Sequence, residues 1–334
     1  MASIAIQSAL LHETSQEFLL RTLTESAARL QNLFTKFIDD QIRAIEDTKV
    51  KIKKRKGVIA FMRIFPNFSI SVENIYAGAT RGAPTTSDLM EVRSMIDTAY
   101  DRINQAMWVS LKQIARESPT MGTQQGAGAD PEDKEVLNYH ILLIENMNHY
   151  IEEVDDGGKE DAVLTRWKGK ALMERAEHLD EYVKRVVRRP LGKVLVSLSA
   201  LIPHHRTLHT DHFHQDFLES TESLLNNGTP PTSIASKPSH SRPAARKALS
   251  TTDGREIRKG IDALRKRIEK HFGDADDEAL SQKLVIFVCG EAEREYGRVL
   301  DRLNRVVADV YSAGEERGVE VEWGVEDVRV GFRR

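Results

Sequence analysis

The residues best suited to chemistry in this sequence are five histidines in one short stretch: His204, His205, His209, His212 and His214. His205 and His209 stand four residues apart, a spacing at which two side chains on one helical face can bind zinc. No glutamate follows the first histidine of this pair, however, so the metalloprotease pattern is absent. We therefore interpret the cluster as a polar surface loop. A metal-dependent enzyme that uses it remains a less favoured alternative.

Three other features could suggest a reaction or a ligand, and each has a simpler explanation. The glycines Gly122, Gly126 and Gly128 have no preceding strand and no Lys-Ser/Thr pair, so they do not form a phosphate loop. The acidic run 274–278 lacks the glycine and distal glutamate of a calcium loop, and suits the start of a helix. Cys289 lies in an apolar run, which predicts a buried, inert thiol. We expect no enzyme, cofactor or metal site.

Basic residues form two candidate contact surfaces. The first is the run 49–56, in which six of eight residues are basic, and the second is one face of a helix near 253–273. The candidate contact residues are Lys49, Lys51, Lys53, Lys54, Arg55, Lys56, Arg258, Lys259, Arg265, Lys266, Arg267 and Lys270. No aromatic residue is interleaved with the first run, which argues against nucleic acid. We interpret each surface first as a solvated helix face. Contact with a protein partner or an anionic lipid surface is the main alternative, and a nuclear-import signal or nucleic-acid patch is a less favoured one.

The composition is typical of long helices. Charged residues make up 30% of the 334 residues and aromatic residues only 6%, with a net charge of -3. Such a balance gives no global attraction for nucleic acid or membrane, so a charged partner must be bound by a local patch. No apolar run approaches the ~20 residues that cross a bilayer. The N-terminus lacks the basic start of a secretory signal, and we expect a cytoplasmic protein.

The segment 253–273 has the clearest local signals. Asp253 and Glu256 form a capping pattern, and Gly273 predicts a left-handed helix end. The apolar residues repeat at helical spacing and predict one buried face: Ile257, Ile261, Leu264, Ile268 and Phe272. The segment 14–52 has a similar stripe, close to a coiled-coil repeat, which predicts packing against other helices: Leu23, Ala27, Leu30, Phe34, Phe37, Ile38, Ile42 and Ile45.

These patterns predict an all-α fold, an elongated rod of stacked helical bundles. We expect one bundle over 1–118, a linker over 119–130, and a second bundle over 131–225. Pro66 is expected to divide a helix pair and Pro190 to restart a helix. The segment 226–252 is rich in Pro, Ser and Thr and predicts a disordered linker. Helices in 253–334, ending in a short one, should pack on the second bundle.

Three stretches also carry a family resemblance. Glu256–Phe272, Glu46–Ile59 with Phe65–Phe68, and Ile144–Tyr150 resemble segments of the exocyst Sec-three subunit family, also called exocyst component one. They occur in the family's order, so the resemblance covers most of the chain. None of them is a catalytic signature.

The resemblance implies a tethering function. Exocyst subunits are helical proteins that assemble with one another and hold secretory vesicles at the plasma membrane before fusion. The implied location is cytoplasmic and peripheral at plasma membrane sites of secretion, and the implied partners are other exocyst subunits. Small GTPases and phosphoinositide membranes are further candidate partners. The family's membrane-binding domain and long N-terminal coiled coil have no counterpart here, so we expect the chain to correspond to the C-terminal bundles. The alternative is a helical adaptor unrelated to exocytosis.

Overall fold

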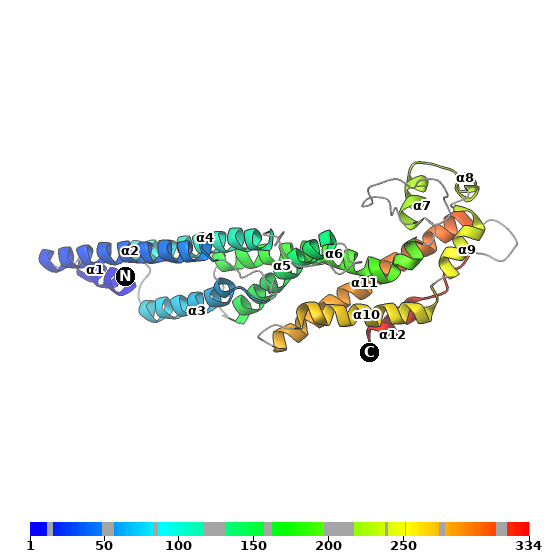
Figure 1. Cartoon of the computed structure of the whole chain (residues 1–334). Coiled ribbons are helices and arrows are strands. Elements are labelled where there is room, and N and C mark those ends of the chain that lie inside the picture. Colours follow the sequence, from blue (N-terminus) through cyan, green and yellow to red (C-terminus); the bar gives the residue numbers. More distant parts are fainter. Residues whose placement is uncertain are drawn as a thin grey trace. The chain divides into compact units, whose positions relative to one another are not determined.

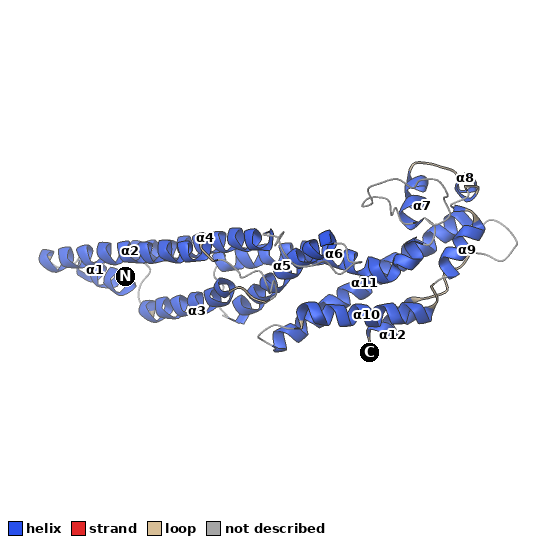
Figure 2. Ribbon diagram, in the orientation of Figure 1, coloured by secondary structure: helices blue, strands red, loops and turns tan. Residues whose placement is uncertain are grey.

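The protein is helical throughout the part of the chain that the structure describes. The computed structural model describes residues 1–11, 16–48, 57–82, 86–116, 131–156, 162–196, 217–237, 240–250, 252–273, 278–311 and 319–333. Within these ranges it contains helices α1 to α12 and no strand (Figures 1 and 2). The predicted all-α class is confirmed. The chain divides into two compact units, Met1–His178 and Leu179–Arg334. The stacking of bundles into a rod stays a prediction.

The first unit is a bundle built around α4. Its helices are α1 (Ala2–Leu11), α2 (Glu17–Glu46), α3 (Ala60–Thr80), α4 (Ser87–Arg116), α5 (Pro131–Asp156) and the beginning of α6 (Ala162–Val196). Helix α2 packs on α1 and α4, while α5 packs on α3 and α4. Figure 1 shows α2 and α4 running side by side. Buried residues of α2 to α6 share one hydrophobic core, because α4 supplies apolar side chains to several neighbours at once.

Aromatic rings fill the centre of this core. Phe65 of α3 stacks on Tyr150 of α5 with ring centroids 6.2 Å apart. Tyr150 in turn meets Trp108 of α4 edge-on at 5.2 Å, and Trp108 lies 5.1 Å from Trp167 of α6. Such pairs add roughly 0.5–1.5 kcal/mol beyond the burial of their area. The rings therefore join four helices.

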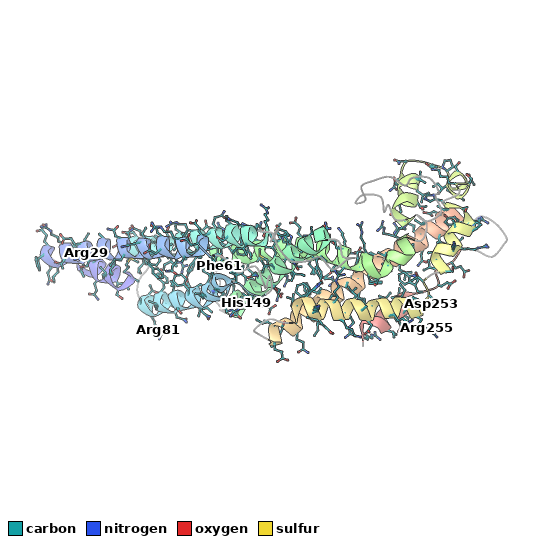
Figure 3. The ribbon with its side chains drawn as sticks, in the orientation of Figure 1. Arg29, Phe61, Arg81, His149, Asp253 and Arg255 are labelled. Atoms are coloured by element: carbon teal, nitrogen blue, oxygen red, sulfur yellow. The ribbon has the colours of Figure 1, made fainter. Side chains whose placement is uncertain are left out.

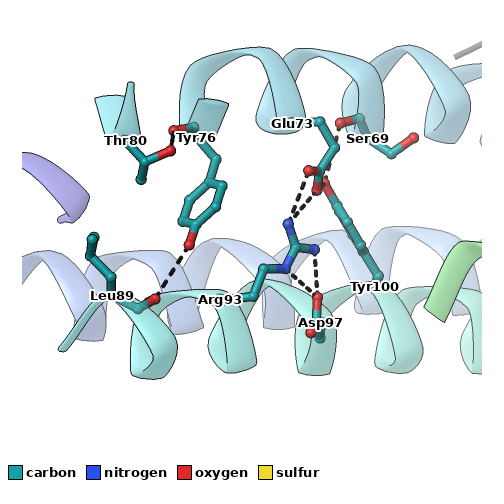
Figure 4. A network of polar contacts seen from close by, with 8 residues as sticks. All are labelled: Ser69, Glu73, Tyr76, Thr80, Leu89, Arg93, Asp97 and Tyr100. Atoms are coloured by element: carbon teal, nitrogen blue, oxygen red, sulfur yellow. Dashed lines mark hydrogen bonds and ion pairs between the residues drawn. The ribbon is translucent and has the colours of Figure 1, made fainter. Parts of the chain in front are cut away.

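A polar network fastens α3 to α4 (Figure 4). The Nη1 atom of Arg93 lies 2.9 Å from each carboxylate oxygen of Glu73, and its Nε donates to Asp97 at 2.7 Å. The hydroxyl of Tyr100 also donates to Glu73, at 3.0 Å. Burial acts to lower the pKa of Arg93, but the hydrogen bonds to Asp97 and Glu73 outweigh it and raise that pKa. Arg93 therefore stays charged within a fully hydrogen-bonded pair.

The second unit is arranged along α11. Its helices are the end of α6, α7 (Phe217–Asn226), α8 (Pro231–Ala235), α9 (Arg242–Ser250), α10 (Gly254–Phe272), α11 (Glu278–Tyr311) and α12 (Val325–Phe332). Helix α11 contacts α7, α8, α10 and α12. Two polar contacts support these packings: Arg302 Nε donates to Glu222 at 3.1 Å, and the hydroxyl of Tyr311 donates to the carbonyl of His240 at 2.8 Å. The predicted short final helix is present as α12.

Two predicted boundaries differ from the structure. The predicted disordered linker, 226–252, contains α8 and α9, and it buries Ile234 and Ala245 completely. Its few apolar residues suffice because they pack into a larger unit, and α8 lies against α11. The predicted bundle boundary at 119–130 lies outside the described residues, but α5, which follows it, belongs to the first unit.

The two prolines expected to break helices lie inside them. Pro66 is within α3 and Pro190 is within α6. A proline removes one hydrogen bond from a helix and commonly kinks it without ending it when packing holds both sides. Pro66 is buried, and so are Phe65 and Ser69 beside it. Tertiary packing therefore overrides the local signal at Pro66.

Candidate functional site

Several predicted sites lie outside the described residues. They are the basic run Lys49–Lys56, the histidines His204–His214, the glycines Gly122–Gly128, and Asp274, Asp276 and Asp277. In the described ranges, no group of three or more His, Cys, Asp and Glu side chains could hold a metal ion. Of the two basic surfaces, the structure thus describes the one on α10.

The start and the apolar face of α10 match the prediction, whereas its end does not. The Asp253 carboxylate accepts a hydrogen bond from the Glu256 N–H at 2.8 Å, which lowers the pKa of Asp253. All five residues of the predicted apolar face are at most 3% exposed. Gly273, however, has φ -86°, so it is not left-handed. A Cβ there would clash with the Glu269 carbonyl oxygen, so close approach of that backbone atom explains this glycine.

The basic face of α10 is partly neutralised by the chain itself. The helix carries seven Arg and Lys residues against three acidic ones. Lys259 pairs with Glu256 and Lys266 with Asp262, each at 2.9 Å. The hydrogen bond to Asp262 raises the pKa of Lys266. Arg265 lies 3.9 Å from Glu269. An anionic ligand would have to compete with these acidic groups, so the surface attracts anions less than its basic residues alone suggest.

Helix α12 fixes the N-terminal half of α10. Asp327 of α12 accepts from Arg258 at 3.2 Å and from the Gly324 N–H at 3.0 Å. A Cβ added at Gly254 would lie 2.5 Å from an Asp327 oxygen, so the two helices approach closely at that point. Figure 3 shows Asp253 and Arg255 at this end of α10. Helix α12 therefore packs closely against the beginning of the second basic surface.

The structure also shows a buried polar cluster that the sequence did not predict. The Gly57 N–H donates to Glu145 Oε2, and the Ile59 N–H donates to Asn146 Oδ1, both at 2.8 Å. The Asn146 amide nitrogen donates back to the Gly57 carbonyl at 3.3 Å and to the Leu142 carbonyl at 2.8 Å. We call Gly57, Ile59, Glu145 and Asn146 the polar clamp. Glu145 is 5% exposed and Asn146 is fully buried, so their hydrogen bonds compensate a real desolvation cost.

The polar clamp holds the residues that directly follow the first basic run. Gly57 adopts φ +96°, a left-handed conformation that favours glycine. The clamp also joins two of the stretches that carried the family resemblance, Glu46–Ile59 and Ile144–Tyr150. A signal for it was present in the sequence, since Glu145 and Asn146 interrupt an otherwise apolar helical face. Their partners, 87 and 88 residues away, could not be identified from that signal.

Comparison with known proteins gives the family. The sequence matches the family described as exocyst complex component Sec3, C-terminal, over residues 1–197 and 214–313. The chain belongs to this Sec3 C-terminal family. The predicted resemblance is thus confirmed, and both halves of the polar clamp lie in the matched residues.

Two curated relatives agree with the Sec3 family. Exocyst complex component 1 of Mus musculus is 22% identical over 311 residues, covering 93% of this chain and 28% of the relative. Exocyst complex component 1 of Drosophila melanogaster is 20% identical over 323 residues, covering 96% of this chain and 29% of the relative. The chain thus spans less than a third of each relative's length. No solved structure matches it. Among the described helices, none is both long and apolar enough to span a membrane.

Proposed function

We propose that this chain acts as the C-terminal part of an exocyst subunit, which tethers secretory vesicles to the plasma membrane in exocytosis. The observation that carries the proposal is the Sec3 family match across nearly the whole chain. The helical fold supports it, because packed helices present extended side-chain faces to other proteins. The partners would be other exocyst subunits, and the protein would work in the cytoplasm at sites of secretion.

A structural role suits the chain better than a catalytic one. Glu145, the buried carboxylate in the described part, serves as a hydrogen-bond acceptor in the polar clamp. Cys289 was predicted to be buried, but it is half-buried. Partial burial raises the pKa of its thiol to about 11. A thiol with such a pKa is a poor nucleophile at neutral pH. These features support a structural role, in which the protein binds partners, over a catalytic one.

The direct test is reconstitution with the other exocyst subunits. The tagged chain would be mixed with those purified subunits at moderate salt and recovered on affinity resin. We expect the other subunits to be retained. An unrelated helical protein with the same tag is the control. Retention no greater than this control, for a chain shown to be folded by circular dichroism, would contradict the proposal.

The two basic surfaces are proposed as contacts for a protein partner or an anionic lipid. The run Lys49–Lys56 is the stronger candidate, because the polar clamp fixes the residues after it and α10 has acidic neighbours. Charge reversal at Lys53, Lys54 and Arg55 should reduce flotation with vesicles that contain phosphatidylinositol bisphosphate. Reversal at Lys259 and Lys266 should have a smaller effect. Unchanged flotation in both variants would rule out lipid contact by these residues.

A further inference from the structure

Helix α2 has an apolar face that is largely uncovered within the part of the chain that the structure describes. It is 30 residues long, and only Ile38 and Ile45 are buried. Leu30, Leu33 and Phe37 are 40%, 63% and 44% exposed. Phe37 is covered on one side by Phe68, with ring centroids 6.1 Å apart. Helices α1 and α4 pack on α2, and Phe68 of α3 covers part of Phe37, while Leu30 and Leu33 stay exposed.

These residues follow the repeat of a coiled coil. Alternating steps of four and three residues separate Leu19, Leu23, Ser26, Leu30, Leu33 and Phe37, of which Leu23 and Ser26 are half-buried and the other four are exposed. We call these six positions the outer seam. Steps of this kind keep the side chains on one line along a helix, where a second helix can interlock with them. The seam runs from Leu19 to Phe37, which is 18 residue steps or roughly 27 Å at 1.5 Å per residue.

The outer seam is distinct from the stripe that packs into the core. Phe34, Ile38, Ile42 and Ile45 belong to the hydrophobic core or pack against it. Leu30 and Leu33 are absent from that core and lie on a different side of the helix. Adjacent exposed leucines at regular spacing are a feature of surfaces that bind other proteins. Helix α2 therefore has two apolar faces, one of which lacks a partner within the described residues.

Two cations border the outer seam on the same side. Arg29 and Lys36 are seven residues apart, so they occupy equivalent positions in the repeat. Neither forms an ion pair with any residue that the structure describes. The acidic residues of α2 close to them are otherwise engaged: Glu25 with Arg21 at 3.2 Å, Asp39 with Arg102 at 2.6 Å, and Asp40 with Arg43 at 3.3 Å. Figure 3 shows the position of Arg29 on α2.

We propose that the outer seam binds an amphipathic helix of another protein, with acidic residues beside the apolar stripe of that helix. In coiled coils, residues bordering the seam select the partner through their charge. A second copy of this chain fits poorly. Antiparallel pairing would place Arg29 and Lys36 against the same cations, and parallel pairing would place them against Phe34 and Gln41. The positive charges of Arg29 and Lys36 therefore favour an acidic partner. This inference does not depend on the exocyst proposal.

The test uses two synthetic helical peptides with the same apolar repeat. One carries glutamate at the positions bordering its stripe, and the other carries lysine there. Binding of each labelled peptide to the full chain would be measured by fluorescence anisotropy. We expect the glutamate peptide to bind about tenfold more tightly, as expected when a few exposed charge pairs change sign. Leu33→Asp should abolish this binding, and circular dichroism should show that the variant remains folded.

A charge-swapped variant tests whether Arg29 and Lys36 select the charge of the partner helix. Arg29→Glu with Lys36→Glu should reverse the preference, so that the lysine peptide binds more tightly. Arg81→Glu at the end of α3 is the control, because Arg81 is exposed and lies outside the seam (Figure 3). Its preference should match that of the unmodified chain.

Four results would overturn the proposal. One is that neither peptide binds, and another is equal binding of both peptides by the charge-swapped variant. A third is self-association of the chain that Leu33→Asp removes, which would identify a second copy as the occupant. The fourth is Leu33-dependent binding to phosphatidylserine vesicles without peptide binding, which would identify a membrane.

Discussion

Helices α2 and α10 are both amphipathic and both carry cations, but they differ in how far their apolar residues are buried and their cations paired. On α10, five apolar residues are buried and the neighbouring cations pair with acidic residues of α10 and α12. On α2, two residues are buried, four of the six outer-seam residues are exposed, and Arg29 and Lys36 have no acidic partner within the described residues. A strong amphipathic pattern can therefore reflect internal packing, whereas a binding face is indicated by groups that remain unsatisfied after folding.

The largest effect should come from the apolar faces. Ile261 of α10 is fully buried, whereas Leu33 of α2 is 63% exposed. Ile261→Ala should lower the free energy of unfolding by about 2–5 kcal/mol, because it removes buried methyl groups and leaves a cavity. Leu33→Ala should change it by about 0.5 kcal/mol or less. Urea denaturation of the two variants measures both free energies of unfolding. Equal losses would contradict the view that Ile261 is buried and Leu33 is exposed.

In the first unit, the buried polar groups of the polar clamp form hydrogen bonds with one another. Asn146→Leu would leave the buried Ile59 N–H without its acceptor. The loss should be about 1–3 kcal/mol of unfolding free energy, the cost of an unsatisfied buried donor. Asn67→Ala on the exposed surface of α3 is the control and should be nearly neutral. If both variants unfold at the same urea concentration as the unmodified chain, the clamp contributes no stability.

The close approach of α10 and α12 can be tested with a pair of glycines. A Cβ at Gly331 would lie 2.9 Å from the Ile261 side chain, whereas one at Gly290 of α11 would meet nothing within 4 Å. Gly331→Ala should destabilise the protein by about 1–3 kcal/mol through overpacking. Gly290→Ala should stabilise it by about 0.4–1 kcal/mol, because alanine loses less backbone freedom in a helix. Thermal denaturation measures both changes. If the two variants shift the melting temperature in the same direction, Gly331 does not pack closely against Ile261.

The smallest effect concerns Cys289 of α11. Burial raises its pKa to about 11 in the folded protein, above the ordinary value of about 8.5 for a free cysteine. The folded state therefore favours the protonated thiol. Any stability from this shift is complete below the unfolded pKa and declines as the pH rises toward about 11.

Iodoacetamide labelling can check the shift, because the sequence contains one cysteine. The rate in the folded chain should continue to rise up to about pH 11. In urea it should level off near the ordinary pKa, about 8.5. Identical pH profiles in the two conditions would show that α11 does not bury this thiol.

Local signals predicted α10 well, because its cap and its apolar stripe depend on residues close together in sequence. The end of α10 was predicted for the wrong reason, since Gly273 is required by the nearby Glu269 carbonyl and not by a left-handed backbone. The segment with α8 and α9 was predicted to be disordered because composition cannot show that Ile234 is buried in a unit built around α11.

The candidate surfaces show the same limit. The stripe on α2 was predicted to pack on other helices, and periodicity could not show that Phe34 would meet the core while Leu33 would stay exposed. The polar clamp depends on pairs 87 and 88 residues apart, which no local pattern specifies. Arg258, Lys259, Lys266 and Lys270 of α10 are exposed, and their role as a contact surface stays a prediction. The pairing of Arg258 with Asp327 of α12 could be found only from the fold.

The contrast between α2 and α10 can be measured directly by hydrogen exchange in a complex. The chain would be compared alone and after assembly with the remaining exocyst subunits. We predict that amides of α2 around residues 27–40 exchange more slowly in the complex, because a partner helix covers the outer seam. Those of α10 should change less, because its cations already pair within the chain. Protection of α10 without protection of α2 would contradict this account.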